Sequence, residues 1–243
     1  MSDFNYAPND IDTTALIGDA TKGWLRPYCG TGKGMEPEVE VARAAWVDLK
    51  GTLSSAQAKA HSILTNEDLN EGGKQRNLAR AAKDFDGAFS EVERRLNVMK
   101  MQIVNDEIYL EKQGRPKPEE TDAWGLHVWK ELADVDPLEI QSLYFKYVED
   151  EPNSPDAAKI SGVMENMIDI KTGRRRLSDD IIAEGRRRRG EIKDPQRAAV
   201  LATLRDAHDH LTWASRNTAA HVSELFTGKR PDAIAETARG FGA

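Results

Sequence analysis

Apolar residues recur at alternating spacings of three and four from Val39 to Ile63. A repeat of about 3.5 residues is typical of the seam of a coiled coil. Pro37 is suited to the first position of such a helix, and acidic residues surround it near the positive end of the helix dipole. The pattern predicts a long helix that ends near Thr65, with a seam of Val39, Ala42, Trp46, Leu49, Leu53, Ala56, Ala60 and Ile63.

A second seam with the same spacing follows after a short polar stretch. That stretch contains Gly72 and Gly73 and predicts a turn. The second helix is predicted to end at Gly114, with a seam of Leu78, Ala82, Phe85, Phe89, Val92, Leu96, Met99, Ile103 and Leu110. Two long seams joined by a short loop predict that residues 36–113 form an antiparallel, coiled-coil-like helical hairpin.

Shorter helices are predicted after a proline-containing linker at residues 114–120, where Pro116 and Pro118 exclude a helix interior. An N-cap residue followed by proline marks three helix starts, at Asp136, Ser154 and Asp194. The pattern predicts a bundle over residues 121–243, with helices near 121–134, 137–149, 155–170, 178–189, 195–226 and 232–239. No segment alternates with a period of two, so the predicted fold class is all-α.

Residues 1–35 lack a lasting period and are rich in glycine and proline, which favours an extended N-terminal arm. The arm is nevertheless apolar, and Trp24, Leu25 and Tyr28 are its candidate binding residues. Two interpretations stay open: these side chains dock onto a partner, or they pack onto the chain's own domain.

Composition narrows the class of protein. Of the 243 residues, 31% are charged and 39% hydrophobic, which suits a helical protein with thin cores. No run of about 18 apolar residues is present, so no membrane association is expected. Cys29 is the single cysteine, which excludes a disulfide scaffold. With no secretory leader recognised, the expected location is the cytoplasm, or the virion if this is a phage protein.

The net charge of −7 argues against a chain that is a nucleic-acid binder as a whole. Residues 171–197 differ from the rest of the chain, because positive charges outnumber negative charges in this segment. The candidate binding residues there are Arg174, Arg175, Arg176, Arg186, Arg187, Arg188 and Arg189. They could be solvated or packed within the chain, meet an acidic protein partner, or contact a nucleic-acid backbone. No aromatic residue lies among them to stack on bases.

Motifs of catalytic chemistry are incomplete in this sequence. The segment Cys29–Gly34 lacks the spacing of a phosphate-binding P-loop. Asp206, His210 and His221 share one helix face and form a weak candidate metal site. His208–Asp209 resembles the dipeptide of HD-type metal phosphohydrolases, although the nearest upstream histidine, His127, is distant. We therefore expect neither an enzyme nor a bound cofactor.

These observations favour a structural protein that acts through protein–protein contacts in a homo-oligomer or a larger complex. The style of the chain is that of a tailed-phage virion component, such as a head-to-tail adaptor or an internal capsid protein, although no motif identifies a family. A DNA-associated regulator or packaging factor that uses residues 171–197 is the alternative. A helical metal-dependent hydrolase is the second alternative.

Overall fold

The computed structural model describes residues 13–29, 34–116, 125–169 and 172–227. Its elements are α1 (Thr13–Ile17), a 3₁₀ turn η1 (Arg26–Tyr28), α2 (Pro37–Leu64), α3 (Glu71–Gln113), α4 (Gly125–Leu132), α5 (Pro137–Asp150), α6 (Pro155–Met164), α7 (Asp179–Lys193) and α8 (Pro195–Thr227). Among the described residues no strand forms, and Ile168 and Arg175 share only an isolated bridge. The all-α prediction is confirmed.

The chain divides into two compact units, and α3 and α8 each contribute to both. Unit 1 contains residues 1–102 and 202–243, and unit 2 contains residues 103–201. The expected division at residues 114–120 therefore differs from the observed one. The reason is that the two longest helices continue past the boundary between the units, whereas the prolines that suggested a linker lie within unit 2.

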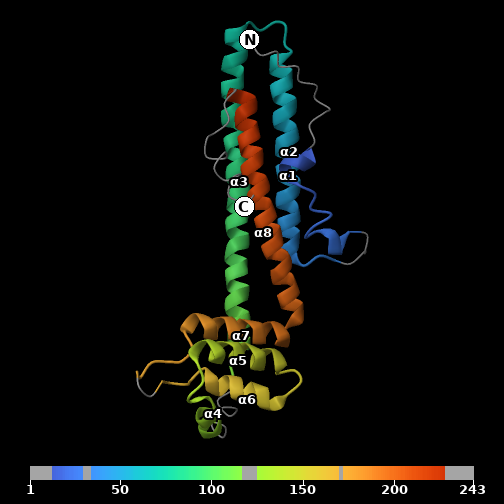
Figure 1. Ribbon diagram of the computed structural model, residues 1–243. Helices are drawn as coiled ribbons and strands as arrows, with labels where there is room; N and C mark the ends of the chain where they lie inside the picture. Colours follow the sequence, from blue (N-terminus) through green and yellow to red (C-terminus); the bar gives the residue numbers. More distant parts are fainter. Residues whose placement is uncertain (1–12, 30–33, 117–124, 170–171, 228–243) are drawn as a thin grey trace. The chain divides into compact units, whose positions relative to one another are not determined.

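Unit 1 is built on α2, the first part of α3 and the last part of α8, which lie side by side (Figure 1). Asp48 of α2 pairs with Arg95 of α3 at 3.0 Å, and Phe85 of α3 stacks on Phe226 of α8. The predicted seam supplies much of the buried interior: Val39, Ala42, Leu49, Leu53, Ala56, Ala60 and Ile63 from α2, with Val92, Leu96 and Met99 from α3.

The N-terminal segment is folded where it is described, which corrects the expectation of an extended arm. Residues 13–28 form α1, a series of turns and η1, and the backbone N–H of Leu25 donates to the carbonyl of Ala20 at 3.0 Å. Ile17, Ala20, Trp24 and Leu25 are buried. Apolar burial therefore holds a glycine-rich segment in short helical turns that its composition did not predict.

Unit 2 contains the shorter helices, and their starts follow the predicted caps in part. The carboxylate of Asp136 accepts from the N–H of Leu138 at 2.8 Å, and that of Asp194 accepts from the N–H of Arg197 at 3.0 Å. Ser154 makes no such bond. The core gathers around Tyr144 and contains Val128, Leu132, Ile140, Tyr144, Val148, Val163, Met164, Met167, Leu177 and Ile182.

Several predicted bounds need correction. Helix α3 begins at Glu71, so Gly72 and Gly73 lie in its first turn, where the Asn70 side chain accepts from the N–H of Gly73 at 2.8 Å. Helix α6 ends at Met164 rather than residue 170. Helix α7 continues to Lys193, which places the arginines 186–189 inside the helix. The predicted helix 232–239 lies outside the described residues.

Glycines allow α3 and α7 to approach at backbone distance within unit 2. A Cβ atom on Gly190 would overlap the carbonyl oxygen of Leu110, and one on Gly114 would overlap that of Arg186. Helices pack this closely only where a side chain is missing on one of them. The crossing of α3 and α7 therefore requires these glycines.

Within the residues that the structure describes, no helix combines the length and the apolarity needed to cross a bilayer.

We predict that Gly190→Ala lowers the free energy of unfolding by about 3 kcal/mol, because the added methyl group has no room beside Leu110. Chemical denaturation followed by circular dichroism measures the loss. Gly51→Ala is the matched control, since a Cβ there meets no atom within 4 Å. That change should stabilise helix α2 by about 0.5–1 kcal/mol. Equal effects at the two positions would contradict the crossing.

Candidate functional site

Arg189 of α7 is one of the charged residues buried in unit 2, with 2% of its surface exposed. Its guanidinium donates to Glu165 at 3.0 Å, to the hydroxyl of Ser161 at 2.9 Å and to the carbonyl of Gly114 at 2.6 Å. It also donates to Glu151. Burial alone would lower the pKa of Arg189, but the carboxylates of Glu151 and Glu165 outweigh burial and raise it. This arginine joins α7 to α6, to the end of α3 and to the residue after α5.

Glu165 is the shared acceptor of this network, and its side chain is 1% exposed. The hydroxyl of Tyr144 donates to it at 3.0 Å, and Nε of Arg186 donates to it at 2.8 Å. Burial, and then the negative charge of Glu165, raise the pKa of Tyr144. Glu165 therefore has the hydrogen-bond partners that a buried structural carboxylate needs. A role in proton transfer would require that a substrate reach this carboxylate.

The neighbouring arginines of α7 also bond within the chain. Arg187 pairs with Glu184 at 2.7 Å and with Glu191. Arg188 pairs with Glu184 at 2.8 Å and with Glu149 at 2.9 Å, and its guanidinium lies over the ring of Phe145. Four consecutive residues of a helix project around its whole circumference, which would direct at least two of these arginines to solvent or to a partner. Instead, carboxylates on facing and adjacent turns neutralise all four.

The earlier arginine run is more exposed. Arg176 donates to the carbonyls of Leu132, Ala133 and Val135, beside the C-terminus of α4, where a cation is favourable. Arg175 pairs with Asp179 at 2.9 Å. Arg174 is exposed. Of the predicted binding residues in this cluster, Arg174 and Arg175 are therefore the most accessible.

The candidate binding residues of the N-terminal segment belong to unit 1. Trp24 and Leu25 are buried against that unit, which corresponds to the self-packing interpretation. Tyr28 is half-buried, and its hydroxyl donates to Glu36 at 2.7 Å. Burial and this carboxylate raise the pKa of Tyr28 to about 12. A partner could reach Trp24 and Leu25 only if the segment left its place.

The candidate metal site is not assembled. No group of three or more histidine, cysteine, aspartate or glutamate residues is placed to share a metal ion in the described residues, which include Asp206, His210 and His221. The ring of His210 instead packs against Gly18 and lies beside Trp213. Helical periodicity brought the three residues to one face without bringing their side chains together. The P-loop-like segment falls largely on residues 30–33, outside the described residues.

Comparison with known protein families, with curated proteins and with solved structures finds no match for this chain.

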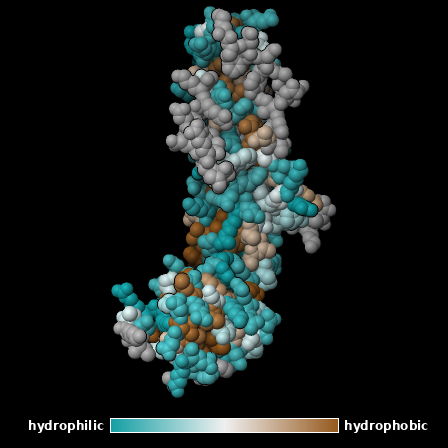
Figure 2. Space-filling view, viewed as in Figure 1, coloured by the Kyte–Doolittle hydropathy of each residue, from teal (hydrophilic) through white to brown (hydrophobic). Residues whose placement is uncertain are grey.

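An apolar surface on α2 and α3 of unit 1 is a feature that the sequence analysis missed. We call Val41, Ala44, Val98 and Met101 the α2–α3 patch. Val98 is 49% exposed and Met101 is 68% exposed. Three of the four residues line a groove of about 330 Å³ together with Glu40, Arg94 and Arg95. Figure 2 shows one face of the molecule, on which hydrophobic residues lie scattered among hydrophilic ones.

The patch lies on the face of α3 that points away from the core. At 100° per residue, Val98 and Met101 fall roughly opposite the buried Val92 and Leu96. Helix α3 therefore carries two apolar stripes. The spacing of three residues between Val98 and Met101 indicates the outer stripe in the sequence. The longer inner seam was sufficient to predict the helix, so the outer stripe was overlooked.

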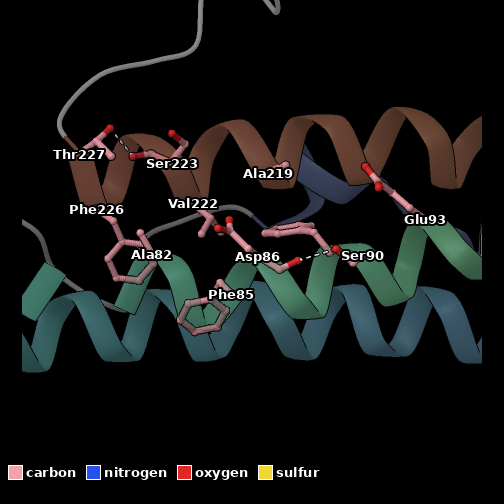
Figure 3. Close-up of a pocket in the computed structure, with 11 residues that line it drawn as sticks. Ala82, Phe85, Asp86, Ser90, Glu93, Ala219, Val222, Ser223, Phe226 and Thr227 are labelled. Atoms are coloured by element: carbon pink, nitrogen blue, oxygen red, sulfur yellow. Dashed lines mark hydrogen bonds between the residues drawn. The ribbon is translucent and has the colours of Figure 1, made fainter. Parts of the chain in front are cut away.

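A second groove of about 330 Å³ lies between α3 and α8 in unit 1. Figure 3 shows Val222 and Phe226 pointing from α8 toward α3, with Asp86 and Glu93 along the opposite wall. Phe85 and Phe89 belonged to the predicted seam. The structure leaves both half-buried, as part of the lining of this groove.

We predict that Arg189→Ala lowers the free energy of unfolding by about 3–5 kcal/mol, because it removes the cation of Glu151 and leaves buried Glu165 with Arg186 alone. Denaturant titration monitored by circular dichroism gives the value. Arg187→Ala is the control, since Arg187 pairs with half-buried carboxylates of its own helix. It should cost about 1 kcal/mol or less.

We predict that Tyr28→Phe reduces the loss of stability at alkaline pH. An unfolded tyrosine loses its proton near pH 10, whereas folded Tyr28 holds its proton to about 12. The unfolded state then binds fewer protons, so stability present below pH 10 is lost as pH rises toward 12. Melting temperatures between about pH 9 and about pH 11.5 measure the slope. Tyr109→Phe, at an exposed ring, is the control; an equal effect of both changes would contradict the assignment.

Proposed function

We propose that this chain is a structural protein that assembles with copies of itself through the α2–α3 patch. The observation that carries the proposal is the exposure of Val98 and Met101 on the side of α3 opposite the core. Adjacent exposed apolar side chains on a helix are typical of contact surfaces, since burial of each square ångström is worth about 25 cal/mol.

The charges around the patch support a contact between identical copies. Glu40 pairs with Arg43, Glu91 pairs with Arg94 and Arg95, and Arg95 also pairs with Asp48. These residues carry three positive and three negative charges, so their formal sum is zero although the chain carries −7. A two-fold contact places a surface against itself, and a surface of mixed, balanced sign avoids repulsion there.

In this proposal, residues 36–113 act as an antiparallel hairpin. Its inner seam holds unit 1 together, and its outer face meets another copy. A coiled-coil-like pairing between hairpins would use the repeat of Val98 and Met101 on α3 and Val41 and Ala44 on α2. A tailed-phage particle, as an adaptor or an internal capsid protein, is the setting in which we place such an assembly.

The alternatives have less support from the described residues. Contact with a nucleic-acid backbone would need cations that are available, and the carboxylates of unit 2 already neutralise arginines 186–189. A metal-dependent hydrolase would need a group of ligands, and Asp206, His210 and His221 do not form one.

The test is the absolute mass in solution, from light scattering after size exclusion at about 0.15 M salt. We expect a discrete oligomer, with a mass that is a multiple of 27.1 kDa. The double variant Val98→Lys/Met101→Lys should shift the mass to the monomer, because two ammonium groups cannot be buried without partners.

Leu138→Lys is the matched control, since Leu138 of α5 is 76% exposed and lies outside the patch. It should leave the mass unchanged, and circular dichroism should show all three proteins folded. A monomer for the unmodified chain, or an oligomer that survives the double substitution, would overturn the proposal.

A further inference from the structure

The groove between α3 and α8 is suited to a segment of polypeptide. It extends along α3 from Ala82 to Glu93, about 17 Å at the rise of an α-helix. Phe85, Phe89 and Phe226 give it aromatic surface, and Phe85 and Phe226 stack with centroids 5.5 Å apart. A lining built on two helices, with aromatic rings at intervals, offers sites for successive side chains of a bound segment.

Two carboxylates give the groove a negative charge. Asp86 and Glu93 lie on exposed positions of α3 within the lining. Neither makes an ion pair within the part of the chain that the structure describes; the hydrogen bond at Asp86 is one that its backbone carbonyl accepts from Ser90. By contrast, Glu91 of α3 and Glu40 and Asp48 of α2 are paired with arginines. The occupant that fits this groove is apolar with basic residues.

The chain itself supplies such a segment next to the groove. Thr227 lines the groove and ends α8, and residues 228–243 follow it directly. They contain three cationic residues, Lys229, Arg230 and Arg239, against two acidic residues, Asp232 and Glu236, so their net charge is +1. The apolar Ile234 and Phe241 lie between and after these charges. Attachment at the edge of the groove gives this segment an effective concentration of the order of millimolar, above that of a free partner.

We propose that the groove between α3 and α8 binds residues 228–243 of the same chain, with Phe241 or Ile234 against the aromatic lining and basic side chains near Asp86 and Glu93. This site is separate from the α2–α3 patch, and the proposal holds whether or not the chain forms an oligomer. The bound segment would cover aromatic surface that α3 and α8 leave accessible.

Photo-crosslinking in the full-length chain tests this proposal. Benzoylphenylalanine replaces Phe241 in one protein and Ile234 in a second, and mass spectrometry maps the crosslinked peptides. We expect crosslinks to residues 82–93 or 219–227 in a product with the mass of one chain. Asp86→Lys/Glu93→Lys should lower the yield about fivefold, the effect of losing two exposed ion pairs.

Glu67→Lys/Asp68→Lys is the matched control, because it makes the same change of net charge at exposed positions of the loop between α2 and α3. Its yield should equal that of the unmodified chain. Absence of groove crosslinks from both probes would overturn the proposal, and so would a yield that the substitutions at Asp86 and Glu93 leave unchanged. Crosslinks found only in a product of twice the mass would assign the groove to a neighbouring copy and would overturn it as well.

Discussion

The buried guanidinium of Arg189 is the interaction on which unit 2 depends. A planar cation with five donors can satisfy two carboxylates, a hydroxyl and a carbonyl at once, and lysine could not do so. Removing such a charge from water is costly, so the cost is recovered only where every donor finds a partner. These bonds connect α7, which packs against α5, to α6 and to the end of α3. The glycine contacts with Leu110 and Arg186 then let the backbones come close enough for the network to close.

Helix α3 illustrates how one element can serve two purposes. Its inner stripe, with Val92 and Leu96, is buried in unit 1, whereas Val98 and Met101 stay in contact with solvent on the other side. Within unit 2 the same helix buries Leu110 and also exposes Ile108 and Tyr109. A helix that is apolar on opposite sides is poorly suited to an isolated domain. The assembly that we propose would give such a helix a partner for its outer stripe.

Local sequence signals predicted the elements better than they predicted the contacts between them. Proline after a capping residue placed the starts of α5, α6 and α8 correctly, because these signals act within one turn of helix. The role of the arginine run could not be read in this way. Arg187 pairs within its own helix, but the environment of Arg186, Arg188 and Arg189 depends on Glu165, Glu149 and Glu151, which lie far away in sequence. The candidate metal residues failed for the same reason, since sharing a helix face does not bring side chains within bonding distance.

The close crossing of α3 and α7 restricts which residues the sequence can carry at a few positions. A contact with backbone atoms cannot be relieved by changing a neighbouring side chain. Replacement of Gly114 or Gly190 by a larger residue therefore cannot be compensated in the way that a substitution in an apolar core can. Gly185, whose absent Cβ leaves room for the ring of Tyr144, stands five residues before Gly190 on the same helix. Gly185 and Gly190 enclose the arginine run of α7, and Gly114 follows the end of α3. Distant relatives whose surfaces have diverged would be recognised by this pattern of three glycines.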